Sequence, residues 1–148
     1  MYWANYRTNS RKTKLHLGFN LNQGIPCKLF LTEGNGAGRP FVSKTVEPGQ
    51  TAVLDRSYQV HSLFDQWQYD GCHFVCRIKE NTQKEILDTY PLPEKSHIVS
   101  DSRVLLGTPG VYQTQQPVRL VGYTVYDKIY WIATDRLNLS AGQIAFIY

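Results

Sequence analysis

The first regular pattern of polar and apolar residues along the chain lies between Lys14 and Leu31. Polar and apolar residues alternate from Lys14 to Leu21, and the turn residues Asn22-Gln23-Gly24 separate this stretch from the apolar-rich run Ile25 to Leu31. Alternation with a period of two is typical of half-exposed strands, and a short loop containing glycine between two such runs is typical of a hairpin. The pattern predicts a β-hairpin over residues 14–31.

A parallel crossover is predicted over residues 51–78. Thr51 to Leu54 is a short apolar run that ends at Asp55, and apolar residues then recur at helical spacing between Val60 and Trp67. Gly71 ends this helix, and residues 73–78 form a second apolar strand. In such a unit both strands run in the same direction, and α/β folds keep their sites at the carboxyl ends of the strands. Asp55 is therefore a candidate site residue.

The remaining sequence is rich in short β-prone runs. The runs 86–87, 98–99, 103–106, 118–126 and 128–133 are separated by proline, glycine and aspartate, which indicates antiparallel strands. Ser140 is a candidate N-cap for a final helix. We therefore predict an α/β core over residues 1–84, a β-rich insertion over 85–136 and the start of a helix over 137–148.

Composition and charge add a candidate partner. The chain is 42% hydrophobic and 19% charged, which is typical of a globular domain, and no apolar run reaches the roughly 18 residues that cross a membrane. We expect a cytoplasmic protein that does not insert into membranes. The net charge is +4, and residues 1–50 carry seven basic against two acidic residues. Basic residues lie there among Tyr2, Trp3 and Tyr6, a mixture suited to DNA phosphates and stacked bases: Arg7, Arg11, Lys12 and Lys14. A solvated basic terminus is the alternative interpretation.

Metal and disulfide motifs are not apparent in the sequence. The three cysteines are odd in number and do not form a paired metal-binding motif, and the four histidines show no zinc-ligand spacing. Each cysteine is expected to be a buried or idle thiol.

Four blocks of the chain, taken in order, resemble bacterial DDE-type insertion-sequence transposases of the insertion-sequence-four group. The blocks are residues 14–32, Leu54-Asp55-Arg56-Ser57-Tyr58, residues 74–81, and residues 132–140 leading into 144–148. The resemblance implies a ribonuclease-H-like α/β core with a β-rich insertion, in which three carboxylates bind two Mg²⁺ ions for DNA cleavage and strand transfer. It implies transposon ends and target DNA as partners, together with a homodimer or a full-length transposase.

The resemblance also implies roles for three residues. Asp55 matches the second catalytic acid, a metal ligand; the alternative is an N-cap for the segment that starts near Ser57. Arg56 matches a position that can contact DNA phosphate, although a plain surface charge is an equal alternative. Tyr148 matches a family tyrosine that contacts DNA and opens the helix carrying the final glutamate.

The chain also departs from the family pattern. The first aspartate is expected before Trp3 and the final glutamate beyond Tyr148, so the sequence is interpreted as a fragment truncated at both ends, with one acid of three. Ser57 replaces a family glycine, which would strain the site if that position required a positive φ. No other aspartate is placed to substitute. We expect the chain alone to be inactive; the alternatives are a non-catalytic DNA-binding or transposition-inhibiting remnant, or a decayed gene product.

Overall fold

The computed structural model describes residues 5–7, 10–34, 42–43 and 45–148, without the side chains of residues 5–7, 10, 11 and 14. The chain divides into two compact units, Met1–Thr45 and Val46–Tyr148, and each unit is described by itself.

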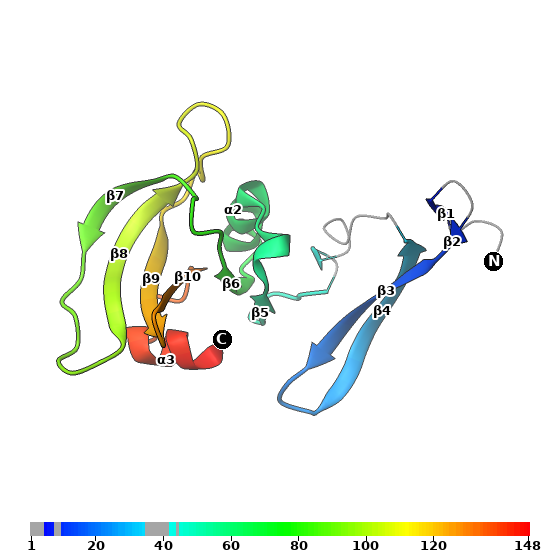
Figure 1. The fold of residues 1–148 in the computed structure, drawn as a ribbon, viewed down its shortest axis with the longest axis horizontal. Helices are drawn as coiled ribbons and strands as arrows, with labels where there is room; N and C mark the ends of the chain where they lie inside the picture. Colours follow the sequence, from blue (N-terminus) through cyan, green and yellow to red (C-terminus); the bar gives the residue numbers. More distant parts are fainter. Residues whose placement is uncertain (1–4, 8–9, 35–41, 44) are drawn as a thin grey trace. The chain divides into compact units, whose positions relative to one another are not determined.

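The first unit contains the predicted hairpin. Strands β3 (Thr13–Asn20) and β4 (Ile25–Glu33) pair antiparallel, with Leu15 opposite Leu31 and Leu17 opposite Leu29 (Figure 1). The turn is closed by Asn20, whose Oδ1 accepts the backbone N–H groups of residues 22 and 23 at 3.0 and 3.1 Å. Two shorter strands, β1 (Asn5–Arg7) and β2 (Ser10–Arg11), also pair antiparallel. The hairpin prediction is confirmed.

The second unit is built on a six-stranded sheet in the order β5-β6-β10-β9-β8-β7 (Figure 1). The first two strands, β5 (Thr51–Leu54) and β6 (His73–Arg77), are parallel. The neighbouring pairs that follow are all antiparallel, and they are formed by β7 (Lys84–Thr89), β8 (Ile98–Leu106), β9 (Val118–Val125) and β10 (Lys128–Thr134).

Two helices cover the two faces of this sheet. On one face, α2 (His61–Tyr69) stacks Phe64 on Phe74 of β6, with ring centroids 4.3 Å apart. On the other face, α3 (Ala141–Ile147) buries Ile144 in a cluster that includes Val75. Phe74 and Val75 are consecutive strand residues, so their side chains point to opposite faces. The second unit is therefore an α/β sandwich of three layers, in agreement with the fold class expected from the sequence.

The end of α2 and the start of α3, both predicted from the sequence, are also confirmed. Asp70 ends α2, and Gly71 follows with a φ of 71°, a left-handed conformation that favours glycine. Ser140 caps α3, where its hydroxyl accepts the N–H of Gln143 and the Gln143 side chain returns a hydrogen bond to the Ser140 N–H.

The β-rich region contains one strand where the sequence predicted two separate runs. Residues 98–99 and 103–106 were expected as separate runs, but they belong to one nine-residue strand, β8. The physical reason is that the intervening Asp101 and Ser102 are buried and paired with β9, so polar residues do not interrupt the strand. The division of the sequence at residues 84 and 136 stays a prediction. Across the described residues, no helix combines the length and apolar character needed to cross a membrane.

Candidate functional site

Asp55 lies at the carboxyl end of β5, where the chain leaves the sheet. Leu54 is paired with Cys76 near the end of the parallel strand β6, so the segments that follow both strands start from the same edge. The side chain of Asp55 is exposed at this edge. The predicted crossover thus delivers the carboxylate to the position at which α/β folds bind their ligands.

Gln59 holds the two segments together. The Gln59 Oε1 atom accepts the backbone N–H of Lys79 at 2.9 Å, and the Gln59 Nε2 atom donates to the hydroxyl of Thr82 at 3.0 Å. Next to this bridge is an open hollow of about 580 Å³ lined by Arg56, Lys79, Glu80 and Asn81. The hollow thus combines two cations, one carboxylate and one amide within reach of solvent.

Tyr148 brings the end of α3 to Asp55. Its phenolic O–H donates a hydrogen bond of 2.9 Å to Asp55 Oδ1, although the two residues are 93 positions apart in the sequence. The structure therefore brings together three residues that the sequence analysis singled out, Asp55, Arg56 and Tyr148.

The surroundings of Asp55 favour its ionised form. The nearby backbone N–H of Arg56 lowers the pKa of Asp55; partial burial opposes this, and the Tyr148 hydroxyl and the charges of Arg77 and Arg56 lower the pKa further. Burial, together with the hydrogen bond to Asp55, raises the pKa of Tyr148 to about 12. At neutral pH the pair is therefore a carboxylate and a neutral phenol that donates to it.

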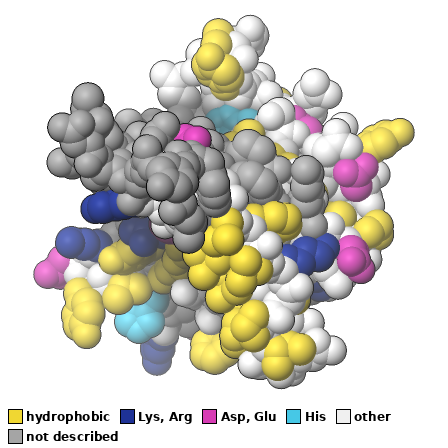
Figure 2. Space-filling view, turned by 90° about the vertical axis from the view of Figure 1, so that its right-hand side faces the viewer, with side chains coloured by type: hydrophobic (Ala, Val, Ile, Leu, Met, Phe, Trp, Pro, Cys, Tyr) yellow, Lys and Arg dark blue, Asp and Glu magenta, His cyan; other side chains and the backbone are white. Residues whose placement is uncertain are grey.

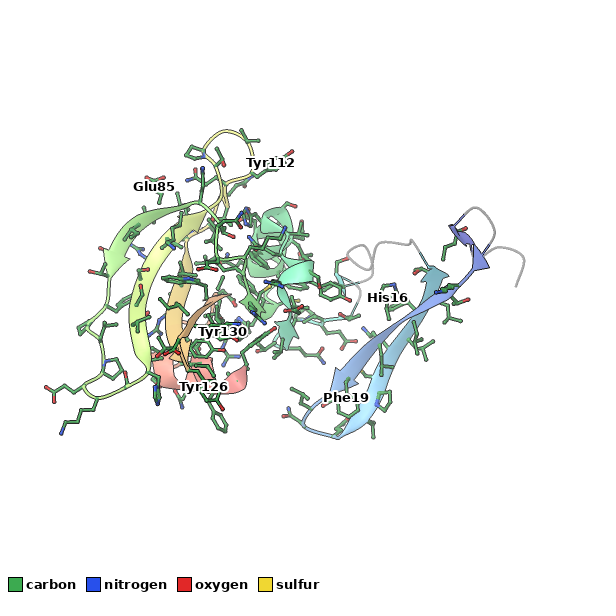
Figure 3. The ribbon with its side chains drawn as sticks, viewed as in Figure 1. His16, Phe19, Glu85, Tyr112, Tyr126 and Tyr130 are labelled. Carbon is green, nitrogen blue, oxygen red and sulfur yellow. The ribbon has the colours of Figure 1, made fainter. Side chains whose placement is uncertain are left out.

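Arg77 connects the site to an aromatic pair on the sheet. The guanidinium of Arg77 lies 4.6 Å from the ring centroid of Tyr130, which is labelled in Figure 3. Tyr130 stacks on Tyr123 with centroids 5.7 Å apart. Arg77, Lys79 and Asn81 were not among the site residues predicted from the sequence. They could have been found, because they end or follow the second strand of the predicted parallel unit and so share an edge with Asp55.

Asp55 has the position of a helix N-cap, its alternative role, but not the side-chain hydrogen bond of one. Asp55 occupies the N-cap position of a short 3₁₀ helix, Arg56–Tyr58, but its side chain makes no capping hydrogen bond to that helix. Ser57 lies inside this helix and is not among the described residues that have a positive φ. The strain that would follow from a positive φ at Ser57 does not arise.

Three of the other aspartates have structural partners away from Asp55. Asp101 pairs with Arg119 inside the sheet, Asp135 pairs with His73, and Asp65 accepts the backbone N–H groups of residues 115 and 116. Among the residues that the structure describes, no three His, Cys, Asp or Glu side chains form a group suited to a metal ion. The carboxylates at this edge, Asp55 and Glu80, therefore do not complete a two-metal centre with the residues described.

Of the basic residues predicted to contact DNA in the first unit, the structure describes the side chain of Lys12 alone. The side chains of Arg7, Arg11 and Lys14 lie outside the described residues, as do Tyr2 and Trp3, and Lys12 is exposed. The three thiols are free; Cys72 and Cys76 are buried, and Cys27 is exposed. Burial raises the pKa of Cys76 to about 12, so this thiol beside Asp55 stays protonated.

Asp55 is thus an exposed, ionised carboxylate flanked by cations, at the strand end where α/β folds bind their ligands. The sequence specifies the family: residues 2–143 match the family described as the transposase DDE domain, so the chain belongs to the DDE transposases. The mixed sheet is consistent with the ribonuclease-H-like fold of these domains. No curated protein and no solved structure matches the chain significantly.

Proposed function

We propose that this chain provides part of the catalytic domain of a DDE transposase of the insertion-sequence-four group, with Asp55 as the second catalytic carboxylate. The proposal depends on one observation, the exposed and ionised Asp55 at the carboxyl end of β5 beside a hollow lined by Arg56 and Lys79. Asp55 is the residue that we propose as a Mg²⁺ ligand, because this ion prefers carboxylate oxygens.

The residues around Asp55 are proposed to hold the DNA backbone and to orient the carboxylate. Arg56 and Lys79 can form charge-assisted hydrogen bonds to a phosphate in the hollow, and Asn81 adds a neutral donor. The Tyr148 hydroxyl fixes the orientation of the carboxylate through Oδ1. Arg7, Arg11, Lys12 and Lys14 are proposed as further backbone contacts. Since the acids at this edge, Asp55 and Glu80, do not belong to a group of three metal-binding side chains among the described residues, we propose that the chain alone does not cleave DNA.

Salt-dependent DNA binding tests the proposed phosphate contacts. Arg56→Gln combined with Lys79→Gln should weaken binding of a labelled duplex and reduce the slope of log affinity against log salt by about 2, since each phosphate contact contributes about 0.9. Lys95→Gln combined with Lys128→Gln removes the same charge from exposed positions elsewhere and should have little effect. Changing Arg11, Lys12 and Lys14 together to Ala should reduce the slope by about 3. Equal losses in the Arg56/Lys79 variant and in its control would contradict the proposed site.

Plasmid nicking and Mn²⁺ binding test the role of Asp55. With Mg²⁺ or Mn²⁺, the chain is expected to nick DNA no faster than its Asp55→Ala variant. Nicking that Asp55→Ala abolishes would refute the prediction of inactivity. Weak Mn²⁺ binding, followed by the loss of the free-ion electron spin resonance signal, should disappear in Asp55→Asn; unchanged binding would show that Asp55 is not a ligand.

A second candidate function is a non-catalytic protein that binds DNA and inhibits transposition. The observation that favours it is the combination of an incomplete set of acids with the three cations Arg56, Arg77 and Lys79 at the same edge. Co-expression with a complete transposase of the same group should then lower the frequency of transposition, and Arg56→Gln with Lys79→Gln should restore it. An unchanged frequency would remove this candidate.

A further inference from the structure

His61, the first residue of α2, joins the loop of residues 107–117 to the bridge that Gln59 makes. The Nδ1 atom of His61 contacts the carbonyl oxygen of Tyr112, and its Nε2 atom lies 2.9 Å from Gln59 Nε2. The loop connects β8 to β9, and Tyr112 lies in it (Figure 3). All of these residues belong to the second unit, so the contacts are internal to it.

The partners on its two sides fix the protonation state of the His61 ring. A carbonyl oxygen can only accept, so Nδ1 must carry the hydrogen that binds Tyr112. Gln59 Oε1 accepts the N–H of Lys79 at 2.9 Å, which leaves Gln59 Nε2, a group that can only donate, facing His61. His61 Nε2 must therefore be the bare acceptor of a neutral imidazole.

Protonation of His61 is incompatible with this arrangement. An imidazolium donates from both nitrogens, so an Nε2–H group would point at the Gln59 NH₂ group across 2.9 Å. Rotating the amide by half a turn would give His61 an acceptor, but it would then set the NH₂ group against the N–H of Lys79. In either orientation Gln59 loses one of its partners when His61 carries a second hydrogen.

Gln59 fixes the segment that lines most of the hollow. It binds the backbone N–H of Lys79 at 2.9 Å and the hydroxyl of Thr82 at 3.0 Å, and these two points bracket the lining residues 79–81. The N–H of Thr82 also closes the turn on the carbonyl of Lys79 at 3.1 Å. Release of Gln59 would free this turn to move relative to Arg56, which lines the hollow from the segment after β5.

The loop stays attached to α2 when His61 is protonated. Val111 and Tyr112 are 63% and 75% exposed, and hydrophobic side chains show at the top of the space-filling view, where the loop lies (Figure 2). The tip of the loop is therefore held by hydrogen bonds, from His61 Nδ1 to Tyr112 and from the N–H groups of residues 115 and 116 to Asp65. Because Nδ1 keeps its hydrogen on protonation, the change acts on Gln59 and not on the loop.

Charged side chains also lie on the segments joined to His61. They are Asp65 of α2, Glu85 of β7, Arg56 before Gln59, and Lys79 and Glu80 after β6. Asp65 and Glu85 are bonded to the loop, at 2.9–3.0 Å to the N–H groups of residues 115 and 116 and at 3.0 Å to Gln113 Nε2. The other three line the hollow. Of the side chains named here, His61 is the one with an imidazole, the group that changes charge between about pH 5 and about pH 8.

We propose that His61 is a positioning residue for the phosphate hollow: its neutral ring holds Gln59 on Lys79 and Thr82, and its protonation releases this bridge and weakens phosphate binding. The inference rests on the proposed function, because it requires that DNA phosphate binds in the hollow. The bridge is intact at higher pH, where His61 is neutral, and it is lost as the pH falls and the ring gains a proton. Binding should therefore weaken toward acidic pH, although protonation of exposed histidines would by itself favour DNA.

DNA binding at two pH values tests the proposal. At constant salt, the affinity of the full chain for a labelled duplex should be about fivefold lower at about pH 5.5 than at about pH 8, since a hydrogen bond of the bridge is lost. His61→Gln offers Gln59 an amide oxygen at every pH and should bind DNA equally at both. The control His97→Gln removes an exposed imidazole before β8 and should keep the fall seen in wild type.

NMR of the unaltered chain measures the bridge without DNA. At about pH 8 the imidazole nitrogen signals of His61 should show a hydrogen on Nδ1 and none on Nε2, and protection of the Lys79 N–H from hydrogen exchange should fall about fivefold at about pH 5.5. An Nε2–H tautomer, or Lys79 protection that is equal at both pH values, would overturn the inference. A fall in DNA affinity that persists unchanged in His61→Gln would overturn it as well.

The variant Arg56→Gln with Lys79→Gln separates this inference from the proposed function. If that variant binds DNA more weakly than wild type, but the wild-type affinity is equal at both pH values, the hollow binds phosphate and the role of His61 is wrong. If that variant binds DNA as tightly as wild type, the proposed function is wrong and this inference fails with it.

Discussion

Removing the carboxylate of Asp101 should strongly destabilise the second unit. Asp101 of β8 accepts two hydrogen bonds from Arg119 of β9, Nε to Oδ1 at 2.8 Å and Nη2 to Oδ2 at 2.7 Å. The two side chains are only 3% and 11% exposed. Asp101→Ala would leave the Arg119 charge buried without its partner, because a guanidinium stays protonated. Breaking a buried pair in this way costs about 3–5 kcal/mol.

The effect should extend to the candidate site. Arg119 Nη1 also donates to the carbonyl of Leu139, the residue before the Ser140 cap of α3, and α3 carries the segment that ends at Tyr148. Asp101→Ala should therefore loosen the start of α3 as well as the sheet. In a protein of this size a loss of 3–5 kcal/mol corresponds to a fall in Tm of about 8–15 °C.

Urea unfolding followed by tryptophan fluorescence, with thermal melting by circular dichroism, measures this loss. The matched control is the double variant Asp101→Leu with Arg119→Met, which replaces the whole pair by apolar residues and should be much less destabilised than Asp101→Ala. A cost below about 1 kcal/mol for Asp101→Ala would refute the reasoning, and so would a double variant that is less stable than the single one.

Three further predictions follow from individual positions. Because the pKa of Tyr148 is raised from 10.0 to about 12, its hydrogen bond to Asp55 stabilises the folded state below pH 10, and this contribution is lost as the pH rises toward 12. The difference in free energy of unfolding between wild type and Tyr148→Phe should therefore shrink above pH 10. A difference that grows above pH 10 would contradict this role of the hydrogen bond. Gly107→Ala should lower the free energy of unfolding in urea by about 2–4 kcal/mol, since the φ of Gly107 is 103° and an added Cβ atom would clash with the Tyr112 carbonyl oxygen. The control Gly110→Ala, at a φ of 75° with open space around it, should lower it by about 1 kcal/mol. Equal losses for the two variants would show that the clash at Gly107 is relieved. Gly142→Ala should stabilise the protein by about 0.5–1 kcal/mol, because Gly142 lies in α3 and the added Cβ atom would meet only the Ser140 hydroxyl oxygen, at 4.0 Å. A lower urea midpoint of unfolding for this variant would contradict the prediction.

The local structure could be predicted because it depends on neighbouring residues. The alternation from Lys14 to Leu21 predicted β3, and the helical spacing from Val60 to Trp67 predicted α2. The cap at Ser140 followed from side-chain chemistry within one helical turn. Asp55 could also be identified in this way, since the end of an apolar strand before a helix specifies one edge of a parallel sheet.

The burial of polar residues could not be predicted in the same way. Asp101 breaks the apolar pattern of its segment, and the sequence analysis took residues 98–99 and 103–106 as separate runs. Its partner Arg119 is 18 positions away, and only the pairing of β8 with β9 makes the buried charge acceptable.

The sequence by itself determined the period of each strand and helix, the ends of α2 and α3, and the carboxylate at the end of β5, because each depends on residues within a few positions. The tertiary structure decided the strand order β5-β6-β10-β9-β8-β7, which brings residues from distant segments to one edge. It also decided that the Tyr148 hydroxyl contacts Asp55 across 93 positions, because α3 packs through Ile144 onto the face that includes Val75. Contacts of this kind depend on how whole elements bury their apolar faces, and no local pattern contains that information.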